Sequence, residues 1–294
     1  MYLVVGANGF LGSYMLKNIL ESTGDKVVAI ARSSEKVTES PRIKWVSCDI
    51  SHMEEVDEIC NMVSEEDNLK VIFLAAYHNP DLVEKNPRLA WNVNITSLSY
   101  FMNKLQNVKC LFYPSTDSVY GNSVNSYHYK EEDALNPVNT YGKQKAAAES
   151  IVMWYGYNVV RYPFLIAPSL SPCKKHFYDK VVEALTNGKT IEMFTDSYRS
   201  SMSFDTAAAL LIRLMENYNE DIPKALNICG DDDLSKYDIG LMLADKLHVS
   251  RDLVIPIRTD QSQGIFEAKR AKSTLMDNSK LKKILGIEQI KLYL

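Results

Sequence analysis

The sequence predicts an α/β protein with a doubly wound parallel sheet, in which helices cover both faces of the sheet. Three observations support this prediction. Short, β-branched segments alternate with helical ones through the first 161 residues. These short segments are apolar throughout rather than at every second position, which is typical of strands buried on both faces. The first strand runs directly into Gly6-x-x-Gly9-x-x-Gly12 and then into an amphipathic segment.

The alternation predicts the order of the elements in the first part of the chain. The expected strands are residues 1–5, 26–31, 43–47, 70–74, 109–113 and 157–161. The expected helices are residues 10–21, 52–65, 88–106 and 139–155. Six strands are the number in a complete doubly wound domain, whose ligands bind at the carboxyl ends of the strands.

After Pro163 the pattern becomes irregular, with further prolines and serines up to residue 172. The later elements expected are helices at 175–187, 205–218, 234–247 and 277–285 and an edge strand at 190–194. We therefore predict one domain over residues 1–165 and a smaller α/β domain over residues 166–294, which would bind the substrate. The stretch of about 203–229 is expected to pack back on the main sheet.

The composition limits the class of protein. The 294 residues are 46% hydrophobic and 24% charged, with a net charge of −4 and no basic block, so nucleic-acid binding is not expected. No apolar run reaches the ~18–20 residues of a membrane span. Because the chain starts with a core strand, there is no room for a signal peptide, and a cytoplasmic protein is expected.

Cysteines and histidines give no sign of a metal site. The histidines are not paired at ligand spacing, and the cysteines are scattered and odd in number. We expect reduced thiols rather than disulfides or metal ligands. The cysteines are Cys48, Cys60, Cys110, Cys173 and Cys229.

The glycine turn is a candidate cofactor site. Glycines there allow a sharp turn, close approach of the backbone to a pyrophosphate, and tight packing of the helix on the sheet. The N-terminus of the following helix would offer N–H groups and a partial positive charge to the phosphates. The candidate residues are Gly6, Asn8, Gly9, Phe10, Leu11 and Gly12.

The end of the second strand indicates which dinucleotide binds. In NAD-binding folds an acidic residue there holds the ribose 2′-hydroxyl, whereas this chain has Arg32. A guanidinium pairs well with a 2′-phosphate, which favours NADP; alternatively Arg32 is a solvated loop residue and NAD is also accepted. Asp49 and Ile50 end the third strand beside the expected adenine. Asp49 could equally serve the start of the next helix.

Two Tyr-x-x-x-Lys matches occur, at Tyr100/Lys104 and Tyr141/Lys145. Only Tyr141 follows a polar cluster, which includes Thr116, at the end of a central strand. At a spacing of four, Tyr141 and Lys145 share one helix face. An ammonium favours the phenolate, which would make Tyr141 a proton donor or acceptor for a carbonyl and alcohol pair, with Thr116 holding the same oxygen.

Several segments together resemble the extended short-chain dehydrogenase/reductase family, particularly its dTDP-4-dehydrorhamnose reductase branch. They are the glycine turn, Leu74–Tyr77, Pro87–Asn94, Ser115–Asp117, Tyr141–Lys145 with Glu149, and Arg270–Asp277. The resemblance implies a Rossmann fold, an NAD(P) cofactor and a nucleotide-sugar substrate, and it is compatible with a homodimer.

The resemblance also implies roles for single residues. Thr116, Tyr141 and Lys145 would be catalytic, and Lys145 would also reach the nicotinamide ribose. Other residues would lie at the cofactor or the substrate. Those near the cofactor are Ala75, Ala76 and Asn94, and those near the substrate are Tyr77, Asp117, Ser118, Arg199 and Arg270. The two arginines are candidates for the nucleotide diphosphate, although each could instead be a packing residue.

The chain departs from the family pattern at Ser118, where the reductases often have an aromatic residue, and at Ala271, where the family tends to have proline. Related dehydratases have Asp-Glu after the threonine, whereas this chain has Asp117-Ser118, which argues against dehydration. An NADP-dependent reductase of a keto-sugar nucleotide is the favoured function. The alternatives are an epimerase or dehydrogenase with bound NAD, a cofactor-binding regulatory subunit, and a reductase of an unrelated small carbonyl compound.

Overall fold

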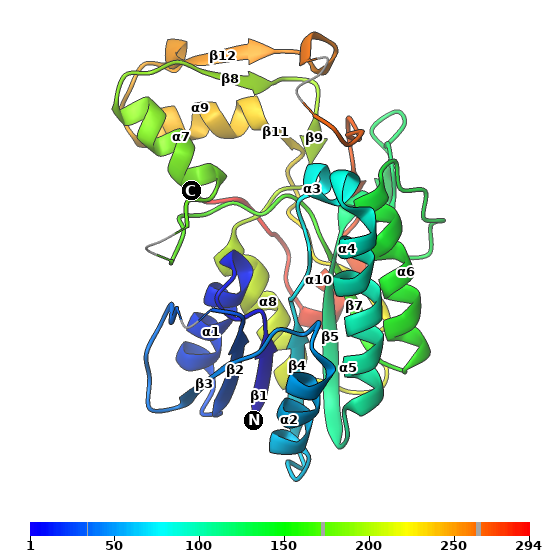
Figure 1. Ribbon diagram of the computed structural model, residues 1–294. Helices are drawn as coiled ribbons and strands as arrows, with labels where there is room; N and C mark the ends of the chain where they lie inside the picture. Colours follow the sequence, from blue (N-terminus) through cyan, green and yellow to red (C-terminus); the bar gives the residue numbers. More distant parts are fainter. Residues whose placement is uncertain (34, 172–173, 263–265) are drawn as a thin grey trace.

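The computed structural model describes residues 1–33, 35–171, 174–262 and 266–294. Its centre is a seven-stranded parallel sheet in the order β10-β7-β5-β4-β1-β2-β3 (Figure 1). The predicted doubly wound α/β fold is confirmed. The strands are β1 (Tyr2–Val5), β2 (Val27–Ala31), β3 (Ile43–Ser47), β4 (Leu69–Phe73), β5 (Val108–Thr116), β7 (Asn158–Tyr162) and β10 (Ala225–Asn227).

The strand order positions the ligand crevice. The chain starts at β1, proceeds to β2 and β3 at one edge, and then returns to β4 on the other side of β1. The loops after β1 and β4 therefore leave the sheet in different directions, and a crevice opens between them. The six expected strands are all present, and the seventh is β10, which pairs with β7.

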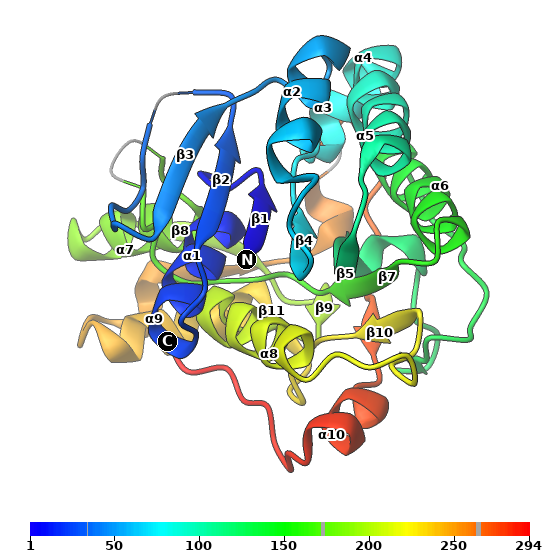
Figure 2. The same ribbon diagram turned by 90° about the horizontal axis from the view of Figure 1, so that it is seen from below.

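Helices cover both faces of the sheet (Figures 1 and 2). On one face lie α1 (Phe10–Ser22) and α8 (Phe204–Glu216), which are joined by the Lys17–Asp205 ion pair at 2.7 Å. On the other face lie α2 (Met53–Val63), α5 (Leu98–Lys104) and α6 (Thr140–Trp154). In the described ranges, no helix is both long and apolar enough to cross a bilayer.

The single helix expected over 88–106 is in fact three pieces. They are α4 (Pro87–Trp91), a π-helical stretch η1 (Asn92–Ser97) and α5, and a separate helix α3 (Pro80–Lys85) precedes them. Proline favours the first turn of a helix, which explains why α3 and α4 both begin at one. The wider π turn contains Asn94, whose side chain is described below with the site.

A second group of elements lies beyond the carboxyl ends of the main strands (Figure 1). Helices α7 (Phe177–Thr186) and α9 (Lys236–Lys246) pack with the parallel pair β8 (Ile191–Phe194) and β12 (Val254–Ile257) around their own apolar cluster. The strand β12 was not predicted. Its sequence includes Pro256, which is tolerated in an edge strand.

Short strands link this group to the main sheet. Strand β9 (Tyr198–Arg199) pairs with β11 (Leu234–Ser235), so α9 begins two residues later than expected. Ser235 caps α9 by accepting the Asp238 N–H at 3.1 Å. The remaining elements are η2 (Asp117–Val119), β6 (His128–Tyr129), η3 (Arg251–Leu253), η4 (Thr259–Ser262), β13 (Leu275–Met276), which pairs with β6, and α10 (Ser279–Leu285).

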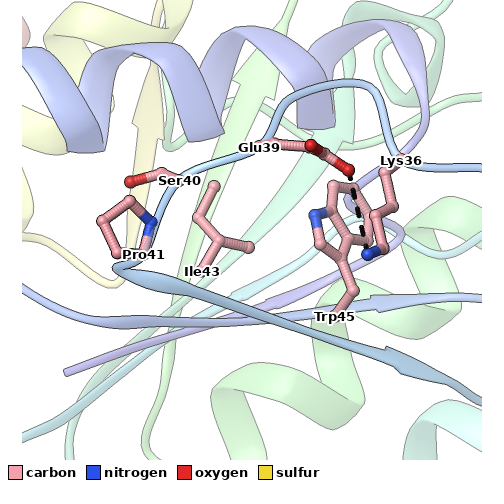
Figure 3. Close-up of a pocket in the computed structure, with 6 residues that line it drawn as sticks. All are labelled: Lys36, Glu39, Ser40, Pro41, Ile43 and Trp45. Carbon is pink, nitrogen blue, oxygen red and sulfur yellow. Dashed lines mark ion pairs between the residues drawn. The ribbon is translucent and has the colours of Figure 1, made fainter.

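The edge strand β3 is flanked by the segment that follows β2. Trp45 donates its indole N–H to the Thr38 carbonyl at 3.0 Å, and Lys36 pairs with Glu39 at 3.9 Å. These side chains help to line a pocket at the outer edge of the sheet (Figure 3). None of the predicted site residues lines this pocket, and β3 lies two strands away from the crevice beside β1.

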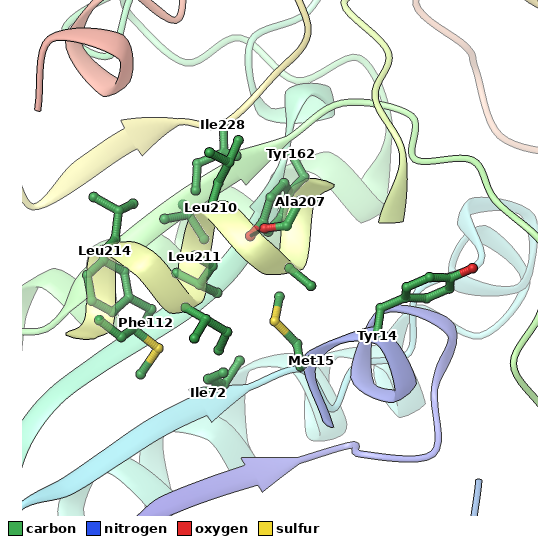
Figure 4. Close-up of a cluster of buried hydrophobic side chains, with 14 of the residues drawn as sticks. Tyr14, Met15, Ile72, Phe112, Tyr162, Ala207, Leu210, Leu211, Leu214 and Ile228 are labelled. Atoms are coloured by element: carbon green, nitrogen blue, oxygen red, sulfur yellow. Dashed lines mark hydrogen bonds between the residues drawn. The ribbon is translucent and has the colours of Figure 1, made fainter. Parts of the chain in front are cut away.

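The larger hydrophobic core lies between the sheet and the α1/α8 layer (Figure 4). Met15 of α1, Ile72 of β4 and Leu211 of α8 are fully buried there. Tyr162 donates to the Ala207 carbonyl at 3.1 Å, so its buried hydroxyl is satisfied. Four cysteines are free and buried, and Cys173 lies outside the described residues. The four are Cys48, Cys60, Cys110 and Cys229.

We predict that Gly12→Ala destabilises the protein by about 1–3 kcal/mol or more, because a Cβ at residue 12 would overlap the Gly6 carbonyl oxygen and lie 2.7 Å from that of Ala7. Denaturant unfolding measures the change. Gly24→Ala is the matched control, since a Cβ there meets nothing within 4 Å. Equal effects of the two substitutions would contradict the proposed close packing of α1.

Candidate active site

The glycine turn joins β1 to α1 at the mouth of the crevice. Gly6 has φ +88°, and a Cβ there would lie 2.9 Å from the Ala75 nitrogen after β4. Gly9 is the N-cap residue of α1, and no side chain caps its free N–H groups. The turn can therefore approach a phosphate closely and offer it backbone donors. Phe10 and Leu11 begin α1 beside it.

The end of β2 lies beside this turn. Asn8 donates its side-chain amide to the Ser33 hydroxyl at 2.8 Å and so ties the glycine turn to the residues after β2. Arg32 is exposed. A solvated guanidinium beside the turn is available to an anionic ligand.

Asp49 and Ile50 follow β3. The Asp49 carboxylate accepts from the Ser51 N–H at 2.9 Å and from its hydroxyl at 2.7 Å. Burial favours the neutral acid, but these hydrogen bonds and the Arg32 charge prevail and lower the pKa of Asp49. Ile50 is buried against α2. Asp49 thus stabilises the turn before α2, which was the alternative role considered for it.

The segment after β4 is fixed by Asn94. Its amide oxygen accepts the Tyr77 N–H at 2.8 Å, and its amide nitrogen donates to the Tyr77 carbonyl at 3.1 Å and to Gln144 at 2.9 Å. Asn94 is buried, and its amide is occupied by protein partners. Asn94 therefore holds Tyr77 against α6.

The end of β5 meets the start of α6. Asn139 caps α6 by accepting the Gly142 N–H at 2.8 Å. A Cβ at Gly142 would lie 2.6 Å from the Ser118 carbonyl, so only glycine allows this approach. The contact brings Tyr141, on the first turn of α6, to Thr116.

The half-buried Tyr141 is a neutral phenol at ordinary pH. Burial and the Asp117 carboxylate raise its pKa, and a hydrogen bond with Thr116 opposes them. Thr116 in turn donates to Asp117 at 2.9 Å and accepts the Ser118 N–H at 3.2 Å. A neutral phenol held beside a hydroxyl can donate a proton to a carbonyl oxygen that gains charge.

Lys145 lies one helical turn from Tyr141 and is 3% exposed. Its ammonium donates to the Tyr113 hydroxyl at 2.6 Å and to the Pro114 carbonyl at 2.7 Å. Both of these partners belong to β5, and in the described residues no hydrogen bond joins the ammonium to Tyr141. Burial lowers the pKa of Lys145 to about 7, although the Glu149 charge opposes this shift.

A buried ion pair lies beneath Lys145. Glu149 is completely buried and pairs with Arg161 of β7 at 2.7 Å, and it accepts from the Ser115 hydroxyl at 2.5 Å. Arg161 also donates to the Tyr120 hydroxyl at 2.6 Å. These partners satisfy both charges, as buried ions require.

Arg199, a candidate for the diphosphate, contacts several groups of the protein. Its Nε lies 3.2 Å from the Asp117 carboxylate, and its other donors go to backbone carbonyls, among them Ala271 at 2.8 Å and Lys272 at 2.9 Å. Thr274 donates to the same carboxylate. Arg199 therefore ties the second group of elements to the end of β5.

Arg270 and Lys236 bring positive charge to the same region. Arg270 pairs with Asp81 of α3 at 2.6 Å, while its Nη1 is buried with no hydrogen-bond partner. The Lys236 ammonium lies 5.5 Å from the Phe164 ring centre and 5.3 Å from that of Phe177. Burial, together with the charges of both arginines, lowers the pKa of Lys236.

Sequence reasoning missed Lys236 and Tyr113. Lys236 is the first residue of α9, and the partial positive charge of a helix N-terminus disfavours a cation there. This unfavourable position was the signal in the sequence that could have indicated a function for Lys236. Tyr113 gave no signal, because an aromatic residue in a buried strand is ordinary. In the described part of the chain, no group of three or more His, Cys, Asp or Glu residues could hold a metal ion.

Two curated proteins are similar to this chain over most of its length. The methionine adenosyltransferase 2 subunit beta of Xenopus tropicalis is 26% identical over 98% of this chain and 83% of its own length. A protein of Haloferax volcanii described as "Probable low-salt glycan biosynthesis reductase Agl14" is 29% identical over 72% of this chain and 70% of its own.

Two solved structures share the fold. The dTDP-4-dehydrorhamnose reductase of Bacillus anthracis, in complex with NADP, has a TM-score of 0.80 at 18% identity and covers 99% of this chain and 94% of its own. The UDP-glucuronic acid 4-epimerase of Bacillus cereus, in complex with UDP-glucuronic acid and NAD, has a TM-score of 0.81 at 20% identity with the same coverage.

The family model described as RmlD substrate binding domain matches residues 1–292. This match covers both the main sheet and the second group of elements, and it confirms the resemblance seen in the sequence. The chain belongs to the RmlD substrate binding domain family.

Proposed function

We propose that this protein reduces the keto group of a nucleotide-linked sugar, with NADPH as the reductant and Tyr141 as the proton donor. One observation carries the proposal. A neutral phenol and a threonine hydroxyl meet at the carboxyl end of β5, and Lys145 lies one helical turn away. Fold alone would not support an activity, but these side chains supply the chemistry that a carbonyl reduction needs.

The residues at the glycine turn fit a dinucleotide. The uncapped start of α1 suits the diphosphate, and the glycines at residues 6 and 9 leave no side chain on the turn to keep a phosphate away from the backbone. Arg32 would read the 2′-phosphate, and Ala76 and Lys145 would lie towards the nicotinamide end. When bound, NADPH supplies the hydride. The relative in complex with NADP supports this choice.

The proton would come from Tyr141. As the carbonyl oxygen of the substrate gains negative charge, the phenol donates its proton and the Thr116 hydroxyl stabilises the same oxygen. The Lys145 ammonium lies one helical turn from Tyr141. Its positive charge would favour the phenolate that remains on Tyr141 after the proton has been donated. Ser118 stands where a dehydratase has glutamate, which supports reduction without loss of water.

The substrate would lie between a cofactor domain, residues 1–165, and a substrate domain, residues 166–294. Lys236 and the Nη1 of Arg270 would receive the diphosphate. Lys236 has no ion pair among the described residues, and the Arg270 Nη1 is buried without a hydrogen-bond partner although the same guanidinium pairs with Asp81. Tyr77 and Ser118 would line the sugar site. A homodimer and a cytoplasmic location stay predictions from the sequence.

A regulatory subunit is the second candidate function. The similarity to a methionine adenosyltransferase subunit beta extends over 98% of this chain, farther than that to the Haloferax reductase. Such a subunit would bind the cofactor without turnover. An epimerase with bound NAD is the third candidate, and the printed ligands of the Bacillus cereus enzyme motivate it.

We predict that the purified protein oxidises NADPH stoichiometrically with at least one keto-sugar nucleotide in a panel, as followed by cofactor absorbance. Tyr141→Phe should lower kcat by about 10²–10⁴-fold, the usual contribution of a general acid, and leave NADPH affinity unchanged. Tyr100→Phe is the control, since that tyrosine has the same Tyr-x-x-x-Lys spacing but bonds Asp57 on α2. Cofactor binding without turnover would favour a regulatory subunit, and sugar interconversion without NADPH loss would favour an epimerase.

We also predict that Arg32→Ala raises the Kd for NADPH about tenfold or more and leaves that for NADH nearly unchanged, because hydrogen bonds to a charged phosphate are lost. Isothermal titration measures both constants. Arg251→Ala removes a positive charge from η3 and should alter neither. If Arg32→Ala weakens both cofactors equally, the arginine does not recognise the 2′-phosphate.

A further inference from the structure

Tyr113 is a second phenol in the active site, on a different element from Tyr141. It lies on β5 and is 2% exposed. Its hydroxyl oxygen accepts a hydrogen bond from the Lys145 ammonium at 2.6 Å. The ammonium is also 3.9 Å from the centre of the Tyr113 ring. An ammonium has three donors, and Tyr113 and the Pro114 carbonyl take two of them.

Strand geometry explains this contact. Alternate residues of a strand point to the same face, so Tyr113 and Ser115 both face α6. Ser115 bonds Glu149 and Tyr113 bonds Lys145, and these two partners are one helical turn apart on α6. Phe112, the residue before Tyr113, points to the other face and belongs to the opposite core beside α8.

We propose that Tyr113 is a positioning residue that holds the Lys145 ammonium against β5, in place for its work beside Tyr141. This inference rests on the proposed function, because it concerns the same site. The Tyr113 hydroxyl is the only side-chain acceptor within hydrogen-bond distance of this ammonium in the described residues. Without it, the buried charge would keep one carbonyl partner.

The consequence is electrostatic. Burial already lowers the pKa of Lys145 to about 7, and a hydrogen bond to the charged form raises it. The other groups that face the ammonium are Glu149 on α6, which raises the same pKa, and His78 on the segment after β4. Burial keeps the pKa of Tyr113 well above its ordinary value, so the phenol stays a neutral acceptor throughout this range.

The first test needs no turnover. Lysine labelled with ¹³C at Cε reports the titration of each side chain by NMR, and Lys145→Arg identifies the Lys145 signal in the cofactor-free protein. We expect Tyr113→Phe to move the Lys145 midpoint about one pH unit lower, because one hydrogen bond to the charged form is lost. Tyr162→Phe is the matched control: it removes another buried hydroxyl from the neighbouring strand, one that bonds Ala207, and should leave the midpoint unchanged.

A second variant covers the case in which Tyr113→Phe does not fold. Replacing Tyr113 by 4-fluorophenylalanine keeps the ring and fills most of the volume of the hydroxyl, but the fluorine is a much poorer hydrogen-bond acceptor and does not ionise. The Lys145 midpoint should then move in the same direction by a smaller amount. An unchanged midpoint in the folded variants overturns the inference.

Kinetics separate this inference from the proposed function. For an active protein, the fall of kcat/KM for NADPH at high pH should follow the free-enzyme midpoint and shift equally in Tyr113→Phe. The kcat/KM of the variant should therefore fall about tenfold at pH 8 and little at pH 6. A merely structural defect would lower kcat/KM by the same factor at both pH values. A shifted midpoint without turnover in the unmodified protein would refute the proposed function and retain the role of Tyr113.

Discussion

The absence of a side chain at residue 142 allows the candidate active site to form. Gly142 lets the first turn of α6 rest on the Ser118 carbonyl, where any Cβ would collide. This contact sets the distance between α6 and the end of β5, and so between Tyr141 and Thr116. Asn139 fixes the direction of the helix by capping it. The approach of Tyr141 to Thr116 therefore depends on backbone packing more than on the contacts of the two side chains themselves.

Burial then sets the charge of these groups. It disfavours ions, so it raises the pKa of Tyr141 and lowers that of Lys145. Each shift opposes the charged pair that the Tyr-x-x-x-Lys spacing predicts. Beneath these groups, Glu149 forms an ion pair with Arg161. The Glu149 carboxylate also raises the pKa of Lys145 and so favours its ammonium form. A neutral phenol near an easily deprotonated lysine suits a proton donor in the reductive direction.

The features that could be predicted from the sequence are those that depend on the local pattern of residues. Apolar runs and the turn at Gly6 defined the sheet, its first helix and the crevice, because these depend on residues close in the chain. The sequence did not predict contacts between distant segments, such as Tyr113 with Lys145 or Arg199 with Asp117. The π turn around residues 92–97 also escaped prediction, because its side chains do not differ in pattern from those of an α-helix.

The link between Arg199 and Asp117 bears on function as well as on stability. It joins β9 to the residue beside Thr116, and Thr274 reaches the same carboxylate from the C-terminal segment. Two segments outside the main sheet thus converge on a carboxylate that raises the pKa of Tyr141. Because the Arg199 guanidinium offsets the charge of Asp117, loss of this contact would strengthen the effect of the carboxylate on the Tyr141 pKa.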